Sequence, residues 1–283
     1  MTNRRKFIQR GAIGMAASFA MPFLSKASAF NQSKNKKNEL LKTGIAGYTF
    51  LNFNLADSLK IMQRLGVKYF SIKDFHLPLN STQQQIQQTV KQINDAGINL
   101  YAVGVIYMKT KEEVDQAFAY AKNAGVDLIV GVPGYDLLDY TEQKVKEYNI
   151  KIAIHNHGPQ DKLYPGPKDV YDHISKRDKR MGLCIDIGHT QRTGVAPAEA
   201  VKQFSDRLFD LHIKDVTAAQ NDGKAIEIGR GVIDFDALLK ALYRINYTGV
   251  CSIEFEKDMK DPVPGIAESL GYFSGAMKEV SLL

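Results

Sequence analysis

The sequence predicts an α/β protein folded as a single (β/α)8 TIM barrel, and three observations support that prediction. Eight short apolar runs recur about every 25 to 40 residues. The segments between them place apolar residues on one helical face. Several of these segments end in a glycine, followed at once by an apolar residue that begins the next run. Alternating units of this kind favour a closed barrel over an open sheet.

The expected strands are residues 44–50, 67–73, 98–108, 126–132, 150–157, 181–187, 208–214 and 249–254. The first intervening segment is typical of the helices, because Leu55, Leu59 and Met62 fall on one face. Glycines mark three joints between helix and strand, at Gly66, Gly97 and Gly125. We therefore expect one barrel domain over residues 43–283.

Residues 1–29 have the features of an export signal. A basic start is followed by a weakly apolar stretch and by the small-residue cleavage site Ala27-Ser28-Ala29. The run Asn3-Arg4-Arg5-Lys6-Phe7-Ile8 resembles a twin-arginine signal, with an ordinary secretory signal as the alternative. The apolar stretch is short and interrupted by glycine and proline, which argues against a membrane span that persists after cleavage. The protein is expected in the periplasm, with residues 30–42 as a flexible linker.

The net charge of +6 does not indicate a nucleic-acid partner. Five basic residues and no acidic residue lie within the first 29, so a chain that begins at Phe30 carries only about +1. A DNA-binding function needs a basic surface to neutralise phosphates. The expected partner is a small molecule, and a homo-oligomer is compatible with the composition.

Polar residues follow the expected strands, and the carboxyl ends of all strands in such a barrel meet at one rim. Five of the six histidines lie at these strand ends. The residues expected at the rim are Tyr48, Lys73, His155, His157, Asp186, His189, His212, Lys214, Glu254 and Glu256.

Asp186, His212 and Glu254 come from three successive strands and suggest a metal site. Carboxylate and imidazole ligands together suit Mn²⁺, Zn²⁺, Co²⁺, Mg²⁺ or Fe²⁺. The alternative is that each residue is a strand-end polar group bonded to a neighbouring loop. Three such residues in consecutive strands, with His189 alongside, favour the metal.

Four stretches resemble the xylose isomerase-like barrel superfamily of sugar isomerases, epimerases and inosose dehydratases. They are residues 181–190, 212–215, 229–234 and 252–256, and the resemblance covers about residues 44–275. It implies a metal held by Asp186, His212 and Glu254, together with a glutamate that follows the fifth strand. Gln160 stands where that glutamate is expected, and His157 is the second choice for the fourth ligand. A glutamine brings no charge and takes up no proton.

The remaining rim residues are assigned roles on this basis. Glu254 is expected to act as ligand and base, while Lys214, His189 and His155 bind hydroxyls or move the second proton. Substrate binding is assigned to Lys73, Tyr48, His157 and Arg230, with Lys73–Asp74 and Arg230–Glu227 ion pairs as the alternatives. A set of aromatic residues could form an apolar wall for a sugar: Tyr48, Phe50, Phe75, Tyr107 and Tyr135.

The resulting hypothesis is a metal-dependent sugar isomerase or epimerase that acts through an enediolate. The alternative enzyme is a lyase or dehydratase that acts on a keto-sugar, an inosose or a 3-keto-glycoside, and the missing carboxylate at Gln160 adds weight to it. A third hypothesis is a sugar-binding protein without turnover. Export argues for uncharged sugars over sugar phosphates.

Overall fold

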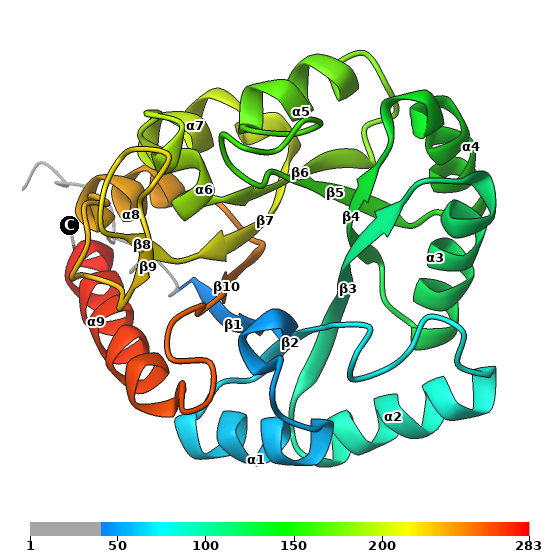
Figure 1. Cartoon of the computed structure of the whole chain (residues 1–283), viewed down its shortest axis with the longest axis horizontal. Helices are drawn as coiled ribbons and strands as arrows, with labels where there is room; N and C mark the ends of the chain where they lie inside the picture. Colours follow the sequence, from blue (N-terminus) through cyan, green and yellow to red (C-terminus); the bar gives the residue numbers. More distant parts are fainter. Residues whose placement is uncertain (1–40, 283) are drawn as a thin grey trace, which may run out of the picture. The chain divides into compact units, whose positions relative to one another are not determined.

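The computed structural model describes residues 41–282, in which eight parallel strands form a closed barrel. Around the barrel the strands follow the order β1-β10-β7-β6-β5-β4-β3-β2, and helices pack outside them (Figure 1). The (β/α)8 prediction is confirmed. The expected signal peptide and nearly all of the expected linker lie outside the described residues. None of the helices in residues 41–282 is long and apolar enough to cross a membrane.

The strands of the barrel are β1 Lys42–Ala46, β2 Tyr69–Ile72, β3 Asn99–Met108, β4 Leu128–Pro133, β5 Lys151–His155, β6 Met181–Asp186, β7 Leu208–Ile213 and β10 Val250–Ile253. Two short strands, β8 Asp215–Val216 and β9 Ala225–Ile226, pair antiparallel in the connection that follows β7. Most strand residues are fully buried, as expected where helices cover a parallel barrel.

The helices are α1 Leu55–Leu65, α2 Gln83–Asp95, α3 Lys111–Ala124, α4 Leu138–Tyr148, α5 Pro167–Ile174, α6 Ile187–Arg192, α7 Pro197–Gln203, α8 Phe235–Arg244 and α9 Val263–Ser281. Short 3-10 helices are η2 Gly47–Phe50, η3 Tyr135–Leu137 and η4 Ser205–Arg207. The glycine joints are confirmed. Gly66 and Gly125 cap α1 and α3 with φ of 72° and 69°, a conformation that glycine adopts without strain.

The first strand is shorter than predicted, and this difference shapes the rim. Residues 44–50 were expected as one strand, but β1 ends at Ala46 and η2 begins at Gly47. The backbone of Gly47 passes so close to β2 that a Cβ there would lie 2.8 Å from the carbonyl oxygen of Ser71. This close approach turns the chain across the carboxyl end of the barrel and brings Tyr48 to the mouth of the site.

Candidate active site

Four buried side chains from neighbouring strands meet at the carboxyl end of the barrel. His155 ends β5, Asp186 ends β6, His212 lies in β7 and Glu254 follows β10. One ligand atom from each lies within 4.8 Å of the other three. The strand register explains the meeting, because Asp186 pairs with His212, and His212 pairs with Ser252 two residues before Glu254.

The atoms of this cluster suit a divalent cation. The Nε2 atom of His155 lies 2.9 Å from Nδ1 of His212 and 3.5 Å from Oδ2 of Asp186, and Oε2 of Glu254 lies 3.3 Å from Nδ1 of His212. Asp186 Oδ2 is buried and accepts no hydrogen bond of good geometry within the described part of the chain. Two imidazoles and two carboxylates are a ligand set for Zn²⁺, Mn²⁺ or Co²⁺. These residues therefore fit a metal ion.

Hydrogen bonds fix the direction in which Asp186 points. Its Oδ1 accepts a bond of 2.8 Å from the backbone N–H of His189 and so caps α6, which leaves Oδ2 facing the cluster. The backbone N–H of Asp186 donates to the side-chain carbonyl of Asn156 at 3.0 Å. The Thr190 hydroxyl donates to the carbonyl oxygen of Asp186 at 2.6 Å. The run Asp-Ile-Gly-His thus places a carboxylate at a helix start with its second oxygen directed toward the cluster.

The ammonium group of Lys214 is surrounded by three carboxylates of the site. Its ammonium lies 3.0 Å from Asp186 Oδ2, 2.8 Å from Glu254 Oε2 and 3.1 Å from Glu256 Oε1. Burial alone would lower the pKa of Lys214, but these three carboxylates raise it well above its usual value. Burial likewise opposes ionisation of Glu254, yet Lys214 and His212 hold its pKa well below the usual range. The site therefore contains charged carboxylates at neutral pH.

A second polar layer lies beneath the cluster and was not predicted. Asp210 Oδ2 lies 4.0 Å from Nε2 of His212, and the Tyr101 hydroxyl donates to both oxygens of Asp210 at 3.0 and 3.1 Å. Burial raises the pKa of Asp210 to about 7. The sequence contains a signal for Asp210, since it stands two residues before His212 and therefore on the same strand face. Nothing in the sequence indicates Tyr101.

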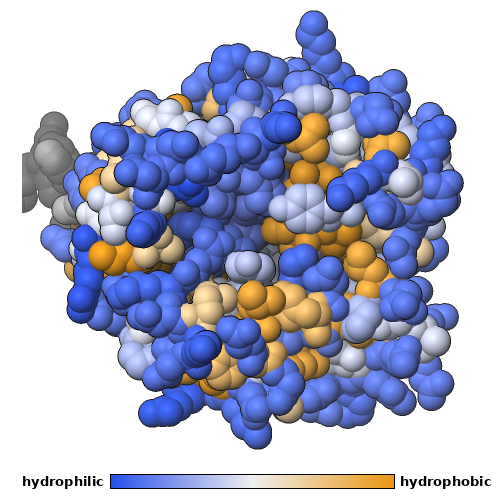
Figure 2. Space-filling view, viewed as in Figure 1, coloured by the Kyte–Doolittle hydropathy of each residue, from blue (hydrophilic) through white to orange (hydrophobic). Residues whose placement is uncertain are grey.

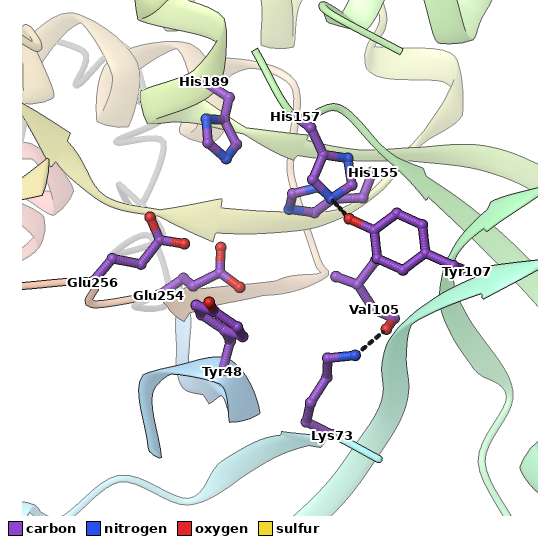
Figure 3. Close-up of a pocket in the computed structure, with 9 residues that line it drawn as sticks. All are labelled: Tyr48, Lys73, Val105, Tyr107, His155, His157, His189, Glu254 and Glu256. Carbon is purple, nitrogen blue, oxygen red and sulfur yellow. Dashed lines mark hydrogen bonds between the residues drawn. The ribbon is translucent and has the colours of Figure 1, made fainter. Parts of the chain in front are cut away.

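A pocket of about 270 Å³ opens next to the cluster (Figure 3). Its lining residues are Tyr48, Lys73, Val105, Tyr107, His155, His157, His189, Glu254 and Glu256. In Figure 3, Glu254, Glu256 and Tyr48 lie on one side, whereas His157, Tyr107 and Lys73 lie on the other. Groups able to take up or donate a proton therefore face each other across the pocket.

Two of these residues are held by partners at the pocket wall. The Tyr107 hydroxyl lies 2.8 Å from Nε2 of His157. The Lys73 ammonium donates to the carbonyl oxygen of Val105 at 2.7 Å and lies 3.0 Å from Asp74 Oδ1. Lys73 thus forms the ion pair considered as an alternative and still lines the pocket.

His189 lies at the edge of the metal-ligand cluster. Its Nε2 is 4.0 Å from Asp186 Oδ2, and its Nδ1 lies 3.3 Å from a guanidinium nitrogen of Arg192. Because a guanidinium can only donate, Nδ1 is the acceptor and Nε2 carries the proton. His189 therefore presents an N–H group beside the pocket.

Two residues assigned to the site lie elsewhere in the structure. Gln160 is exposed; its Oε1 accepts a 2.8 Å bond from Arg192 and its Nε2 donates to the carbonyl oxygen of Asn221. The loop leaves the barrel at Gly158, whose φ is 91°, so the position counted along the chain from His157 points away. His155 takes the fourth place in the cluster. Arg230 is exposed and pairs with Glu268 rather than with Glu227 or the pocket.

Replacing Gln160 by Glu is therefore expected to leave the affinity for Mn²⁺ or Zn²⁺ nearly unchanged. His155→Ala is expected to weaken it by at least about 10- to 100-fold, because even the residues that only orient a ligand contribute that much. Isothermal titration calorimetry on the two variants measures both effects. If Gln160→Glu binds the metal ion more tightly and His155→Ala binds it normally, Gln160 rather than His155 is the fourth metal ligand.

Acidification is expected to destabilise the metal-free protein. Burial lowers the pKa of His155 and His157, and lowers that of His189 to about 4 from 6.5. Between the lowered pKa of each histidine in the folded protein and its ordinary value of 6.5, the unfolded chain binds more protons than the folded chain. Stability therefore falls as the pH falls through this range. Burial also disfavours charged His212, but Glu254 raises its pKa, and burial raises the pKa of Asp210 to about 7 and that of Glu256, so these groups oppose the three histidines and reduce the slope.

The unfolding temperature in the presence of a chelator should therefore fall between pH 7 and pH 5. The expected slope is about 1.4 kcal/mol per pH unit for each extra proton bound by the unfolded chain. A thermal melt at each pH measures it. An unfolding temperature that is constant or rises on acidification would mean that these imidazoles are not held neutral.

Residues 59–275 match the family described as xylose isomerase-like TIM barrel, and the chain belongs to this family. It is 32% identical over 149 residues to an inosose dehydratase of Clostridium botulinum, covering 46% of this chain and 47% of that one. It is 27% identical over 103 residues to the putative L-ribulose-5-phosphate 3-epimerase SgbU of Escherichia coli, covering 35% and 36%. The alignments span less than half the length of these curated relatives.

Solved structures agree on the fold. An uncharacterised protein of Parabacteroides distasonis is 29% identical, with a TM-score of 0.66 over 83% of this chain and 98% of that one. The zinc-bound IolI protein is 20% identical, with a TM-score of 0.69 over 85% and 98%. The 3-keto-D-glucoside 4-epimerase YcjR of E. coli is 17% identical, with a TM-score of 0.67 over 83% and 99%. At these identities the last two support the fold alone.

Proposed function

We propose that this protein is a metal-dependent isomerase or epimerase that moves a proton at the carbon next to the carbonyl group of a sugar. The observation that carries the proposal is the pocket with groups able to transfer a proton on both sides (Figure 3), next to a cluster of four residues that fits a cation. An epimerase must remove a proton and return one to the opposite face of the same carbon, which two opposed groups can do, whereas an isomerase returns the proton to the neighbouring carbon of the enediolate.

His155, Asp186, His212 and Glu254 would hold the metal. A divalent ion there would polarise a carbonyl oxygen and make the neighbouring C–H more acidic. Glu254 also lines the pocket and its carboxylate remains ionised at neutral pH, so it can accept the proton. The Lys214 ammonium, beside Glu254, stabilises negative charge that develops on the sugar oxygens.

His157 is placed to serve the other face. Burial lowers its pKa, so the imidazole is neutral at neutral pH and can both accept and donate a proton. Its Nδ1 is buried without a hydrogen-bond partner among residues 41–282, so Nε2, which lies 2.8 Å from the pocket-lining Tyr107 hydroxyl, is the nitrogen that can exchange a proton with a substrate. Proton removal by Glu254 and return through His157 would invert the configuration at the carbon. This assignment removes the need for a carboxylate at Gln160.

A lyase is the second candidate, and the similarity to an inosose dehydratase favours it. Elimination begins with the same proton removal by Glu254. A group on the opposite wall of the pocket would then donate a proton to the hydroxyl or alkoxy group on the next carbon. That group leaves as water or as an alcohol. The same residues therefore serve both reactions, and the substrate decides which follows.

Solvent deuterium separates the candidates. The metal-loaded protein is incubated in D₂O with ketoses, inososes and 3-keto-glycosides, and products are followed by NMR. An epimerase or isomerase yields an isomer labelled at the carbon that exchanged its proton, whereas a lyase yields an unsaturated ketone. Sugar binding without exchange or elimination across this panel would contradict both proposals and support a sugar-binding protein.

We also infer from residues 1–29 that the protein is exported to the periplasm by the twin-arginine route. Export would favour uncharged sugars and glycosides as substrates. Mass spectrometry of the protein from a periplasmic extract tests this. Loss of export in Arg4→Lys/Arg5→Lys is the expected result, and unchanged export would point to an ordinary secretory signal.

A further inference from the structure

Large apolar side chains are exposed along one side of the barrel mouth. They belong to loops and 3-10 helices that follow the first strands, or to the end of β3, and are 37% to 48% exposed. We call this set the aromatic rim: Tyr48, Leu51, Phe75, Tyr107 and Tyr135. Figure 2 shows apolar residues along the lower and right-hand borders of the central hollow, whereas its upper border is hydrophilic.

The distribution of these side chains around the barrel is uneven. The segments after β5, β6 and β10 contribute the polar residues His157, His189 and Glu256 to the pocket, and Lys214, which follows β7, is buried beside Glu256. Single exposed apolar residues are ordinary on a protein surface, but several on adjacent loops around one hollow indicate a ligand-binding groove. The aromatic rim and the catalytic residues thus form two halves of one mouth.

The aromatic rim continues the pocket outward. Tyr48 and Tyr107 line the pocket and also belong to the rim. The pocket itself measures about 270 Å³, which is below the roughly 300–1,000 Å³ of sites for drug-sized ligands. It has room for one sugar ring. A second ring attached to that sugar would therefore lie outside the pocket and over the rim.

Neighbouring groups hold two of the rim side chains, Tyr135 and Phe75, in place. The ring of Tyr135 stacks on His173 at 4.0 Å with an interplanar angle of 5°, and its hydroxyl donates to the carbonyl oxygen of Leu163. The ring of Phe75 lies 4.5 Å from His76. Rings that are already fixed lose little freedom when a ligand stacks on them. These contacts make the aromatic rim a prepared binding surface.

We propose that the aromatic rim is a second subsite, which binds a ring with an apolar face attached to the sugar in the pocket. The substrate class is then an uncharged glycoside that carries a keto group on its sugar ring, because the proposed proton transfer needs a carbonyl, and the aglycone or second ring stacks on Phe75 and Tyr135. This inference rests on the proposed function, because it requires a sugar in the pocket. The apolar ring can be an aromatic aglycone or the C–H face of a second sugar.

Calorimetry with matched glycosides tests the subsite. The probes are methyl and 4-nitrophenyl β-glycosides of glucose, galactose and xylose, with cellobiose as the disaccharide, added to the metal-loaded protein. We expect the nitrophenyl member of a pair to bind about tenfold tighter, because stacking of aromatic rings contributes a factor of this order. A comparable gain for cellobiose over methyl β-glucoside would identify a second sugar as the natural occupant, and a gain confined to nitrophenyl glycosides would identify an aromatic aglycone.

Variants assign the gain to the aromatic rim. Phe75→Ala and Tyr135→Ala should each remove most of the nitrophenyl advantage and leave the methyl glycosides unchanged, because neither residue lines the pocket. Tyr272→Ala is the matched control, since Tyr272 is 45% exposed but lies on α9. The thermal melt of each variant verifies folding, and the two rim variants serve as independent tests.

Two results would contradict the subsite. One rejects the subsite alone, and the other also rejects the proposed function. Equal affinity for methyl and nitrophenyl glycosides, or rim variants that behave like Tyr272→Ala, would reject the aromatic rim as a subsite and leave the sugar pocket intact. Failure of the wild-type protein to bind any of these glycosides, or any of the ketoses, inososes and 3-keto-glycosides, would reject the sugar pocket and with it the proposed function.

Discussion

Replacing Glu254 by Gln is expected to lower kcat by about 10²- to 10⁴-fold, even at saturating metal. The substitution keeps the size of the side chain but removes the proton acceptor and one of the two negative charges in the metal-ligand cluster. It should also weaken metal binding. The rate of solvent deuterium exchange into the substrate measures the proton-transfer step directly.

Glu227→Gln is the matched control for this loss. Glu227 is also buried, but it pairs with Lys257 at 2.6 Å and does not line the pocket. Its substitution should leave exchange close to the wild-type rate. Exchange at wild-type rates in Glu254→Gln would exclude Glu254 as the base, and Glu256, on the same side of the pocket, would replace it.

Lys214→Met is expected to destabilise the metal-free protein by about 3–5 kcal/mol, the usual cost of removing one partner from a buried ion pair. Lys214 is 3% exposed, and its ammonium is shared by Asp186, Glu254 and Glu256. Without it these carboxylates are buried with less compensating charge. Urea unfolding in the presence of a chelator measures the change.

The same substitution should tighten binding of Mn²⁺ or Zn²⁺. Lys214 contacts Asp186 Oδ2 and Glu254 Oε2, which are the oxygens that face the metal-ligand cluster, so its charge opposes that of an incoming cation. Metal should therefore stabilise Lys214→Met more than it stabilises the wild-type protein. Weaker metal binding by Lys214→Met would show that Lys214 does not oppose the cation.

Lys144→Met provides the comparison for the stability change. Lys144 also contacts two carboxylates, those of Asp115 and Glu147, at 2.9 Å each, but both of these acids are about half exposed. Exposed ion pairs contribute about 0–1 kcal/mol. If Lys214→Met and Lys144→Met lower the free energy of unfolding equally, the buried carboxylates do not need the charge of Lys214 for stability.

The barrel was predictable because its elements follow local rules. Buried parallel strands are continuous apolar runs, and glycines such as Gly66 and Gly125 end helices where only a left-handed conformation continues the chain. The error in the first strand had a tertiary cause. Residues 47–50 are apolar enough for a strand, but the packing of Gly47 against β2 turns them into a 3-10 helix.

The site was partly predictable for the same reason. Asp186, His212 and Glu254 come together because the strands are in register, which the order of the motifs already implies. Gln160 was selected by counting along a loop, and the direction of a loop depends on contacts such as the one with Arg192. Asp210 and Tyr101 meet across the barrel interior, and sequence spacing carries little information about such pairs.

Metal content and its effect on stability test the central claim most directly. The purified protein is analysed for divalent metals, and its unfolding temperature is measured before and after chelation and after addition of Mn²⁺, Zn²⁺ or Co²⁺. We predict about one metal ion per chain, and an unfolding temperature that falls on chelation and recovers on addition, as linkage requires for a ligand bound to the folded state. No bound metal, and no change in unfolding temperature with any of the three ions, would contradict a metal site at His155, Asp186, His212 and Glu254.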